Sequence, residues 1–422
     1  MATRRNAKKL YFPDGALLNA MEVAVVESER RKTEIMKEPY TVYLVETRPI
    51  DSSFSGETGS ALWRRYSEFE LLRNYLMTVY PFIVMPPLPE KRINMQKLQL
   101  ATDKFDPEFI ERRRQGLECF LLRLASHPTI SQDKMFVGFL NQEMNWKEAV
   151  VATGFQSKLN VARWKLISAT TSVKKPDQRF EDVRSYCESL SANINALIKL
   201  QQRMTERQLI VAQNHGGYGK LLSEWSGIEN EMADGLQMGG HHIDRYNQQT
   251  TSILEEEGTV YLDQLKEYLF FTESLRAIVK KQQQKQCELE KAEDALSAKV
   301  AQRDEVLRQI QAETGENPPP SPPGFSLKGI SNILFGAETV EAKQEKANEL
   351  SKQVEEAEEA VRERQAEVNL FVDRALKDYD RFKKQKVRDL TEVMQNYIKM
   401  QIKFCKTGLQ SWKSAKECFA NI

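Results

Sequence analysis

The sequence lacks long apolar runs and carries almost no net charge. No segment approaches the roughly 20 consecutive apolar residues that a membrane-spanning helix needs. The N-terminal stretch MATRRNAKKL also lacks the apolar core of a secretory signal, so we expect a soluble, intracellular protein. With 61 Lys and Arg residues against 60 Asp and Glu residues, the formal net charge is +1. Binding to an anionic surface would therefore depend on local basic clusters, and we expect no nucleic acid partner.

Cysteine and histidine are scarce, with 5 and 4 residues in the 422-residue chain. The cysteines are widely spaced and lie mostly on apolar faces of predicted helices, which favours reduced thiols over a disulfide framework or a zinc site. His241 and His242, in the stretch GGHHID, could suggest a pair of metal ligands, but they lie in a predicted turn without a cysteine partner. The sequence also lacks a Gly-rich phosphate loop and a nucleophile elbow. We therefore expect neither an enzyme nor a protein that holds a metal or cofactor.

Up to about residue 150, the sequence predicts a small α+β domain. Strand patterns occur in MEVAVVE, YTVYLVET and ALWRRYSEF, with polar turns between them, and these predict a three-stranded antiparallel meander. The segment FELLRNYLMTVY predicts a helix. The next segment, FIVMPPLPEKR, cannot be helical, because each proline removes a hydrogen-bond donor and restricts the residue before it. Helical spacing of apolar residues returns in FDPEFIERRRQGLECFLLRLASHP, and DKMFVGFLNQE closes the domain.

Beyond about residue 175, the sequence predicts long helices that pack as a bundle or coiled coil. Apolar residues recur every three or four positions, as in Phe180, Val183, Cys187, Leu190, Ile194 and Leu197. The last helix, from about Glu338 to beyond Phe404, would extend on the order of 100 Å. An elongated rod seldom buries so long an apolar seam by itself, so we expect a dimer.

Two turns are predicted to divide this part into three long helices. Gly235, Gly239 and Gly240 predict the first turn. The stretch ENPPPSPPG at residues 316–324 predicts the second, because a polyproline run cannot continue a helix. The stretch HGGYG at residues 215–219 interrupts the first long helix.

Two basic clusters are predicted on the second and third long helices. They contain Arg276, Lys280, Lys281 and Lys285, and Arg374, Lys377, Arg381, Lys383, Lys384, Lys386 and Arg388. If the helices are antiparallel, both clusters lie roughly 50 Å from the proline turn. A basic patch of this kind suits an anionic lipid surface, although it could also be a merely solvated polar face. We take Lys280, Lys281, Arg381 and Lys384 as the candidate membrane contacts.

Two other segments could contact a membrane through apolar side chains. The stretch GFSLKGISNILFG after the proline turn brings Phe325, Ile333 and Phe335, which either cap the bundle or insert into a bilayer or a neighbouring dimer. The linker TGFQSKLNVARWKLISATT has one apolar side, formed by Phe155, Leu159, Ala162 and Leu166. It is either an interfacial helix or a packing linker.

The motifs RRYSEF, PPLPEKR and FIERRRQGLECFLLRLASHP, in this order and spacing, resemble the phosphoinositide-binding PX domain. Because three long helices follow them, the chain resembles sorting nexins of the PX-BAR class. The resemblance implies an α+β PX domain over residues 15–145 and a linker over residues 146–176. It further implies an all-α BAR domain over residues 177–422, an elongated three-helix antiparallel coiled-coil bundle with a tip loop at about residues 314–337.

The same resemblance implies a binding site for phosphatidylinositol 3-phosphate. Arg65 would pair with the 3-phosphate, Tyr66 would stack under the inositol ring, Lys91 would meet the 1-phosphate and Arg113 would bond ring hydroxyls. The chemistry of these side chains agrees, because a guanidinium offers a rigid fork to phosphate and a lysine serves as a point charge. Arg64 should have a structural or peripheral role, since adjacent residues on a strand face opposite sides.

The resemblance predicts a peripheral membrane protein on the cytosolic face of early and recycling endosomes. It would sense or induce membrane curvature in cargo recycling, with a second role in autophagy, as a homodimer or as a heterodimer with another BAR-type sorting nexin. The stretch Met85–Leu88 either dips into the bilayer or forms a rigid turn. One alternative function is a scaffold that recruits SH3 domains through PPLP or PPPSPP. Another is a cytoskeletal coiled coil without membrane activity.

Overall fold

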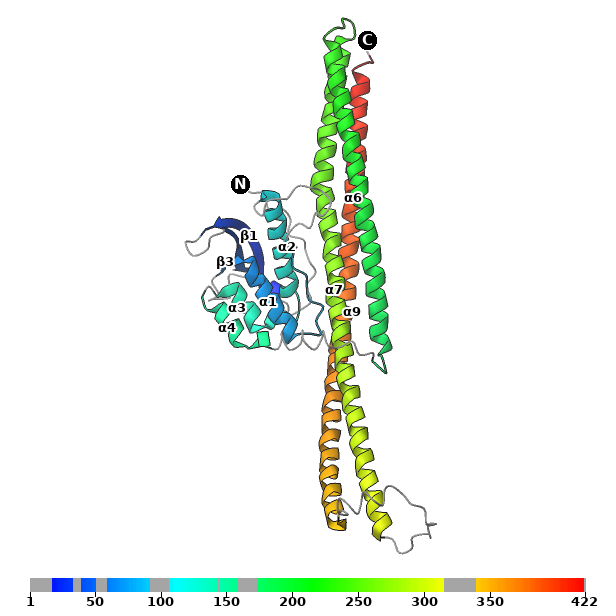
Figure 1. Ribbon diagram of the computed structural model, residues 1–422. Coiled ribbons are helices and arrows are strands. Elements are labelled where there is room, and N and C mark those ends of the chain that lie inside the picture. The colour runs from blue at the N-terminus through cyan, green and yellow to red at the C-terminus, as the bar shows by residue number, and fades with distance from the viewer. Residues whose placement is uncertain are drawn as a thin grey trace, which may run out of the picture. The chain divides into compact units, whose positions relative to one another are not determined.

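The computed structural model describes residues 17–32, 39–50, 59–91, 106–142, 144–157, 173–314 and 339–420 (Figure 1). The chain divides into two units. The larger unit combines Met1–Arg163, Asp182–Ile278 and Lys377–Ile422, and the smaller unit combines Trp164–Glu181 and Val279–Leu376. Among the described residues, the helices contain no stretch with the length and hydropathy of a membrane span.

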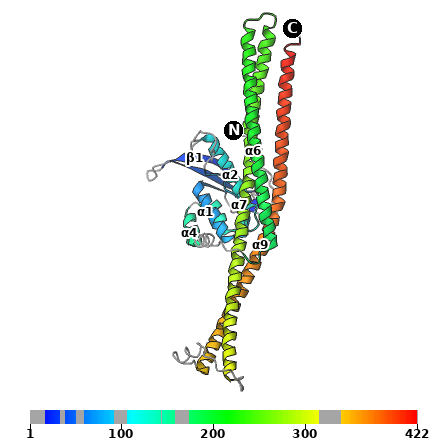
Figure 2. The same cartoon turned by 45° about the vertical axis from the view of Figure 1, so that its right-hand side comes forward.

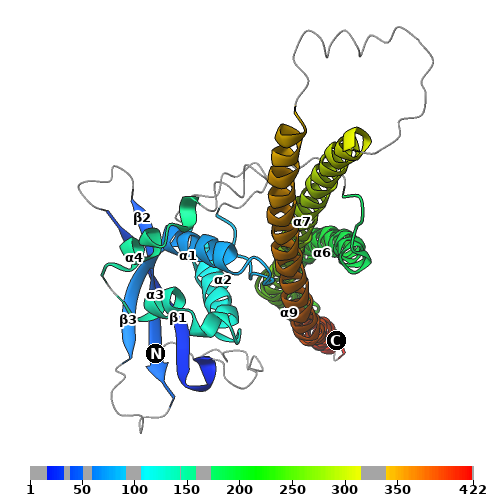
Figure 3. The same ribbon diagram turned by 90° about the horizontal axis from the view of Figure 1, so that it is seen from below.

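The larger unit begins with a sheet and its covering helices. The strands β1 (Met21–Arg31), β2 (Tyr40–Pro49) and β3 (Ser60–Arg65) form a three-stranded antiparallel sheet in the order β1-β2-β3, which confirms the predicted meander. Helices α1 and α2 lie on the same side of this sheet (Figure 3). The helical elements are η1 (Leu17–Asn19), α1 (Tyr66–Val79), α2 (Pro107–Ala125), η2 (Ile130–Gln132), α3 (Lys134–Asn141) and α4 (Trp146–Ala152).

The sheet buries one face, as its alternating pattern predicts. Val45 of β2 lies opposite Val25 of β1 and Leu62 of β3, and all three are buried. Helices α1 and α2 add Phe69 and Phe120 to this core. Because side chains alternate along a strand, the residues between these positions face the other side of the sheet. The end of β3 can therefore direct two consecutive arginines to opposite faces.

Residues that were predicted to belong to the linker complete this core. Helix α4 buries Trp146 and Val150, and the ring of Phe155 lies edge-on to Tyr75 with 5.8 Å between their centroids. Phe155 is 2% exposed, so it does not form an apolar surface for a bilayer. Three further residues of the predicted interfacial helix lie outside the described part of the chain: Leu159, Ala162 and Leu166.

Three long helices follow in the described residues, as predicted: α6 (Gln178–Ser226), α7 (Ala233–Thr314) and α9 (Val340–Glu417). Figure 2 shows them from a second direction. The predicted tip residues Phe325, Ile333 and Phe335 lie outside the described part of the chain. The turn predicted at Gly235, Gly239 and Gly240 is wrong, because these glycines lie inside α7 and the chain turns before Ala233. The stretch HGGYG likewise lies inside α6.

The glycines inside α6 and α7 allow the backbones of these two helices to approach each other closely. A Cβ atom on Gly219 would lie 2.6 Å from the carbonyl oxygen of Gly240. A Cβ atom on Gly240 would lie 2.5 Å from the carbonyl oxygen of Gly219 and 2.6 Å from Oγ of Ser223. Glycine costs a helix interior about 1 kcal/mol relative to alanine, and the close backbone packing offsets that cost here. The sequence feature that suggested a helix break is therefore a packing feature.

In the smaller unit, Glu290 of α7 binds the segment that leads into α6. Its carboxylate accepts the backbone N–H groups of Lys174 and Lys175, each at 2.9 Å, and the side chain is buried. The ammonium of Lys174 also pairs with Asp294 at 2.7 Å. The buried apolar residues of this unit include Val279, Cys287, Leu289, Ala347, Val354, Val368, Phe371, Val372 and Ala375.

Candidate functional site

Tyr66 stands at the centre of the predicted site, at the first position of α1. Its hydroxyl donates a hydrogen bond of 2.6 Å to the carbonyl oxygen of Pro89, so the phenol is held against the proline loop. Burial, assisted by the nearby charge of Glu70, raises the pKa of Tyr66 to about 12. The side chain is therefore neutral at physiological pH, and its ring has a fixed orientation.

Two cations from different elements lie over the Tyr66 ring. The guanidinium carbon of Arg113, on α2, is 5.1 Å from the ring centroid, and Nζ of Lys91, after the proline loop, is 5.8 Å from it. Arg113 also lies 4.2 Å above the ring of Phe109 and donates a hydrogen bond to the carbonyl oxygen of Lys91. The structure thus brings together Tyr66, Lys91 and Arg113, which are far apart in the sequence.

Arg65 precedes Tyr66 and occupies the N-cap position of α1. Its backbone N–H donates to Glu68 at 2.7 Å, which helps the helix to begin here. Its guanidinium carbon lies 3.9 Å from the centroid of the Tyr40 ring. This side chain is partly exposed, at the place where the strand ends and the helix begins.

Arg64 points to the opposite face, which confirms its predicted structural role. Its Nε and one terminal nitrogen donate to the carbonyl oxygen of Phe139, at 3.1 and 2.8 Å. The guanidinium also stacks on the rings of Phe139 and Trp146, and the residue is 3% exposed. One arginine of the pair therefore holds α3 against the sheet, and the other is partly exposed beside the Tyr40 ring.

The proline loop packs against its neighbours at several points. The Nε of Arg73 donates to the carbonyl oxygen of Pro86 at 3.1 Å. The hydroxyl of Ser274 donates to the carbonyl oxygen of Met85 at 2.7 Å. Met85 is 2% exposed and belongs to the core, so the rigid-turn interpretation of residues 85–88 is confirmed at this position. Of the PPLP stretch, Pro86 is buried, whereas Pro87, Leu88 and Pro89 are partly exposed. The stretch PPPSPP lies outside the described residues.

Gly116 of α2 permits the loop to approach the helix, a role that the sequence alone does not reveal. A Cβ atom at this position would lie 2.7 Å from Cβ of Pro89. Because real Cβ contacts are longer than 3 Å, any larger residue would displace the loop. Pro89 carries the carbonyl that holds Tyr66, so Gly116 indirectly positions the ring.

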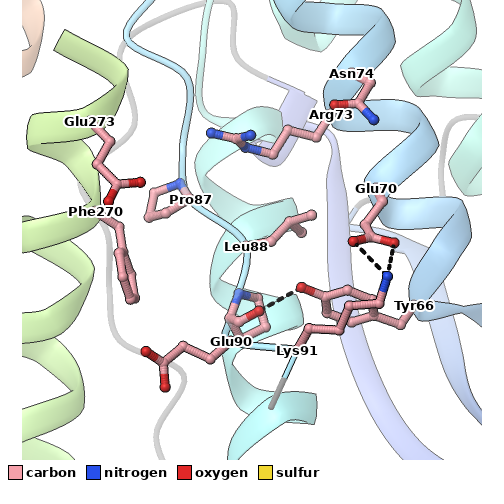
Figure 4. Close-up of a pocket in the computed structure, with 11 residues that line it drawn as sticks. Tyr66, Glu70, Arg73, Asn74, Pro87, Leu88, Glu90, Lys91, Phe270 and Glu273 are labelled. Carbon is pink, nitrogen blue, oxygen red and sulfur yellow. Dashed lines mark hydrogen bonds and ion pairs between the residues drawn. The ribbon is translucent and has the colours of Figure 1, made fainter. Parts of the chain in front are cut away.

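A cavity of about 320 Å³ opens beside Tyr66 and Lys91 (Figure 4). The ammonium of Lys91 pairs with the Glu70 carboxylate there, at 2.9 and 3.1 Å. The lining residues come from α1, the proline loop and α7, and they are Tyr66, Glu70, Arg73, Asn74, Pro87, Leu88, Pro89, Glu90, Lys91, Phe270 and Glu273. The cavity is thus polar, with carboxylates and cations in one space.

Arg123 of α2 makes a buried polar contact between the α+β domain and the long helices. It makes two hydrogen bonds with Glu267 of α7, at 2.5 and 2.8 Å, and pairs with Asp389 of α9 at 2.8 Å. The hydroxyl of Tyr268 donates to the same Asp389 carboxylate at 2.6 Å. The partners of Arg123 lie more than a hundred residues away in the sequence, and no local motif indicates them.

His127 makes a second buried contact of this kind. Its Nε2 lies 2.9 Å from Asp378 of α9, while its Nδ1 accepts the backbone N–H groups of Thr129 and Ile130 at 3.1 and 3.3 Å. Nε2 therefore carries the proton and donates to the carboxylate. Burial lowers the pKa of His127 and keeps the ring neutral. Asp378 also accepts from Arg381 at 2.8 Å, and its pKa is lowered to about 2 by these partners in spite of burial.

The predicted membrane contacts have different environments. Lys280 and Lys384 are exposed. Nζ of Lys281 donates to Oε1 of Gln284 at 3.1 Å, and Arg381 is engaged by Asp378, with 26% of its side chain exposed. Of these four cations, Lys280 and Lys384 are the most accessible.

Other sequence candidates lie elsewhere. His241 and His242 are on α7, with 6.0 Å between their ring centroids. Among the described residues, there is no group of three or more His, Cys, Asp or Glu side chains that could hold a metal ion. All five cysteines lie in the described residues, and none of them forms a disulfide.

Apolar side chains remain exposed along α6 and along the parts of α7 and α9 that belong to the larger unit. They include Leu197, Leu200, Met204, Ile210, Val211, Tyr218, Leu221, Trp225, Met238, Val260, Ile398, Ile402, Leu409 and Trp412. So many large apolar residues on helices are unusual for an isolated surface and are typical of a protein interface.

Comparison with known proteins agrees with this architecture. The PX domain family matches residues 52–143. Sorting nexin-4 of Mus musculus and that of Homo sapiens are each 46% identical over 410 residues, covering 96% of this chain and 88% of the relative. A structure described as "The cryo-EM structure of the SNX-BAR Mvp1 tetramer" covers 93% of this chain and 99% of that chain, with a TM-score of 0.55 at 18% identity, and supports the fold. The chain therefore belongs to the sorting nexins that carry a PX domain and a BAR domain, a family of non-enzymatic, peripheral endosomal proteins of membrane trafficking.

Proposed function

We propose that the chain binds phosphatidylinositol 3-phosphate on the cytosolic face of early and recycling endosomes and acts there in cargo recycling. The observation that supports this most is the meeting of Lys91 and Arg113 on the ring of Tyr66. An aromatic face suits the apolar side of an inositol ring, and the surrounding cations suit its phosphates. A role in autophagy is a further part of the proposal, by resemblance to the family.

Each side chain has a distinct role in this proposal. Arg65 binds the 3-phosphate through its partly exposed guanidinium, which leaves the Tyr40 ring when lipid arrives. Tyr66 lies under the sugar ring, with its hydroxyl held by Pro89. Lys91 binds the 1-phosphate, and Arg113 donates to ring hydroxyls. Binding therefore adds charge-assisted hydrogen bonds to phosphate in place of cation–π contacts, and at Lys91 the phosphate competes with the Glu70 carboxylate.

Arg65→Ala tests the site directly. The full-length variant should lose binding to vesicles that contain phosphatidylinositol 3-phosphate, because it loses the fork that holds the phosphate, while its thermal unfolding stays near that of the wild type. Arg48→Ala is the matched control, since Arg48 is an exposed strand arginine that pairs with Glu46 in the same strand. Undiminished sedimentation of Arg65→Ala with these vesicles would contradict the assignment.

Membrane curvature is the second part of the proposal. The exposed apolar residues of the long helices support a dimer, which would be a homodimer or a heterodimer with another BAR-type sorting nexin. The exposed Lys280 and Lys384 support contact with an anionic leaflet, with Lys281 and Arg381 beside them in the sequence clusters. Two headgroup sites on one dimer would then sense or induce tubular curvature as these cations meet the bilayer.

A further inference from the structure

The cavity beside Tyr66 carries more negative than positive charge. Its lining contains three carboxylates, from Glu70, Glu90 and Glu273, against two cations, from Arg73 and Lys91. Of the four proposed headgroup residues, Tyr66 and Lys91 line this cavity, so its negative excess lies to one side of the headgroup site. The excess of carboxylates next to the lipid-binding residues therefore suggests a role in selecting between phosphoinositide headgroups.

Glu70 acts on the site at contact distance. Its carboxylate holds Nζ of Lys91 at 2.9 and 3.1 Å, and its charge contributes to the raised pKa of Tyr66. Lys91 is 67% exposed on its side chain, so its contact with Glu70 does not bury it. The effective charge that Lys91 presents to a ligand is thereby reduced.

Glu273 reaches the same cavity from α7, about two hundred residues further along the chain. Figure 4 shows Glu273 and Arg73 on opposite sides of Pro87. Burial lowers the pKa of Arg73, and the charge of Glu273 acts in the opposite direction, so the two groups interact electrostatically. Glu273 is exposed and free to change without disturbing a packed core.

We propose that Glu273 and Glu70 are specificity-determining residues of the headgroup site, which disfavour inositol headgroups that carry a second phosphate. This inference rests on the proposed phosphoinositide function. A single 3-phosphate is held by Arg65, which does not line the cavity, whereas a second phosphate on the ring adds charge beside a cavity with excess carboxylate. Helix α7 thus takes part in headgroup selection, although it lies outside the PX domain and far from it in the sequence.

The physical basis is repulsion between fixed charges. A phosphate monoester carries about −1.5 to −2 charges at pH 7. At separations of about 10 Å with water between the charges, each carboxylate should weaken binding of that extra phosphate roughly threefold, and salt screens the effect. Two carboxylates together would give a preference of about tenfold for the monophosphate.

The experiment measures binding of the full-length protein to neutral phosphatidylcholine vesicles doped with one lipid at a time. The lipids are phosphatidylinositol 3-phosphate and the 3,4- and 3,5-bisphosphates. In the double variant Glu70→Gln with Glu273→Gln, the ratio of monophosphate to bisphosphate affinity should fall by about tenfold relative to the wild type. Each single variant should lower this ratio roughly threefold. Raising the salt concentration should shrink the difference between variant and wild type.

Controls separate charge from structure. Glu273→Asp keeps the charge and should keep the wild-type ratio, and so should Glu392→Gln, at an exposed carboxylate of α9. A merely structural role would lower binding of all three lipids in parallel and leave the ratio unchanged, which would overturn the inference. A wild-type preference for either bisphosphate would overturn it too. If the wild type and Arg65→Ala bind the monophosphate equally, the proposed function itself fails, and that result is distinct from an unchanged ratio.

Discussion

Gly116 shows how a residue without a side chain can control a binding site that it does not touch. In a helix interior, Gly→Ala normally stabilises by about 1 kcal/mol. At this position the new Cβ would meet Pro89 at 2.7 Å and displace the loop that holds the Tyr66 hydroxyl. We expect Gly116→Ala to weaken headgroup binding several-fold while the protein stays folded, as vesicle sedimentation and thermal unfolding would show.

Gly217→Ala is the matched control for this prediction. Gly217 lies inside α6, and no atom lies within 4 Å of a Cβ built on it. This change should raise thermal stability slightly and leave lipid binding unchanged. If Gly116→Ala binds vesicles as tightly as Gly217→Ala, the loop does not depend on the missing side chain.

At the residue scale, the sequence predicts side-chain direction better than side-chain partners. The opposite orientations of Arg64 and Arg65 follow from the alternation of a strand, which is a local rule. The meeting of Arg113 with Tyr66 was expected only from family resemblance. The role of Gly116 depends on how closely a distant proline approaches, and helix propensity alone would suggest the opposite effect of a substitution.

His127 connects the end of α2 to α9 and should make stability depend on pH. Burial lowers its pKa below the ordinary value of 6.5, so below that pH the unfolded chain binds a proton that the folded chain does not. The free energy of unfolding should therefore fall as the pH falls from about 6.5 toward the lower folded-state pKa. The charged groups that face His127 are Asp378, which favours protonation, and Arg381, which opposes it.

His127→Gln tests this dependence by urea unfolding at about pH 7.5, 6 and 5. The amide can still donate to Asp378 but cannot titrate, so the variant should lose about 1–2 kcal/mol at neutral pH and show a flatter pH dependence. His241→Gln, at an exposed position of α7, is the control and should behave as the wild type does. A His127→Gln profile as steep as that of the wild type would assign the acid sensitivity to other groups.

The basic residues of the long helices separate into two kinds. Lys280 and Lys384 are exposed, whereas Arg381 is bound to the buried Asp378. Charge reversal of Lys280, Lys281 and Lys384 should reduce vesicle binding and tubulation and make the remaining binding less sensitive to salt, because each cation near an anionic leaflet contributes about 1 kcal/mol. The melting temperature should change little.

Arg381→Glu should behave differently from that triple variant. It places a second carboxylate beside Asp378, so we expect a loss of thermal stability in addition to any loss of membrane affinity. Equal effects of both variants on stability would show that Arg381 is not part of the contact between α9 and the α+β domain. Tubulation that survives the triple reversal with unchanged salt dependence would mean that these lysines only solvate the helices.

At the scale of elements, the apolar periodicity predicts the helices correctly, whereas the glycine positions predict one turn at the wrong place. The period of three and four residues predicts the helical character of α6, α7 and α9, because each must bury a stripe of side chains. The glycines near residue 240 indicate a break if each is read alone. In the folded chain, Gly219 and Gly240 face each other, and tertiary packing outweighs their low helix propensity. Only the partner helix distinguishes these cases.

At the scale of the whole molecule, the exposed apolar residues of the long helices predict self-association. Leu221 of α6 is 64% exposed and Leu409 of α9 is 58% exposed, which is costly for side chains of this size in water. Burial against a second chain removes that cost. Two lipid sites on one dimer would then bind one vesicle, so the second contact forms without a further loss of translational freedom.

Leu221→Glu combined with Leu409→Glu tests both steps in the full-length chain. Each glutamate would have to be buried without a partner in a dimer, so we expect light scattering to give the monomer mass, with headgroup selectivity preserved. Vesicle affinity should fall on the order of a hundredfold, because only one site remains for each particle. Val26→Glu, at an exposed position of β1 in the α+β domain, should keep both the mass and the affinity of the wild type. A double variant that keeps the dimer mass would place the interface elsewhere, and a monomeric variant with unchanged vesicle affinity would show that the second headgroup site adds nothing to membrane binding.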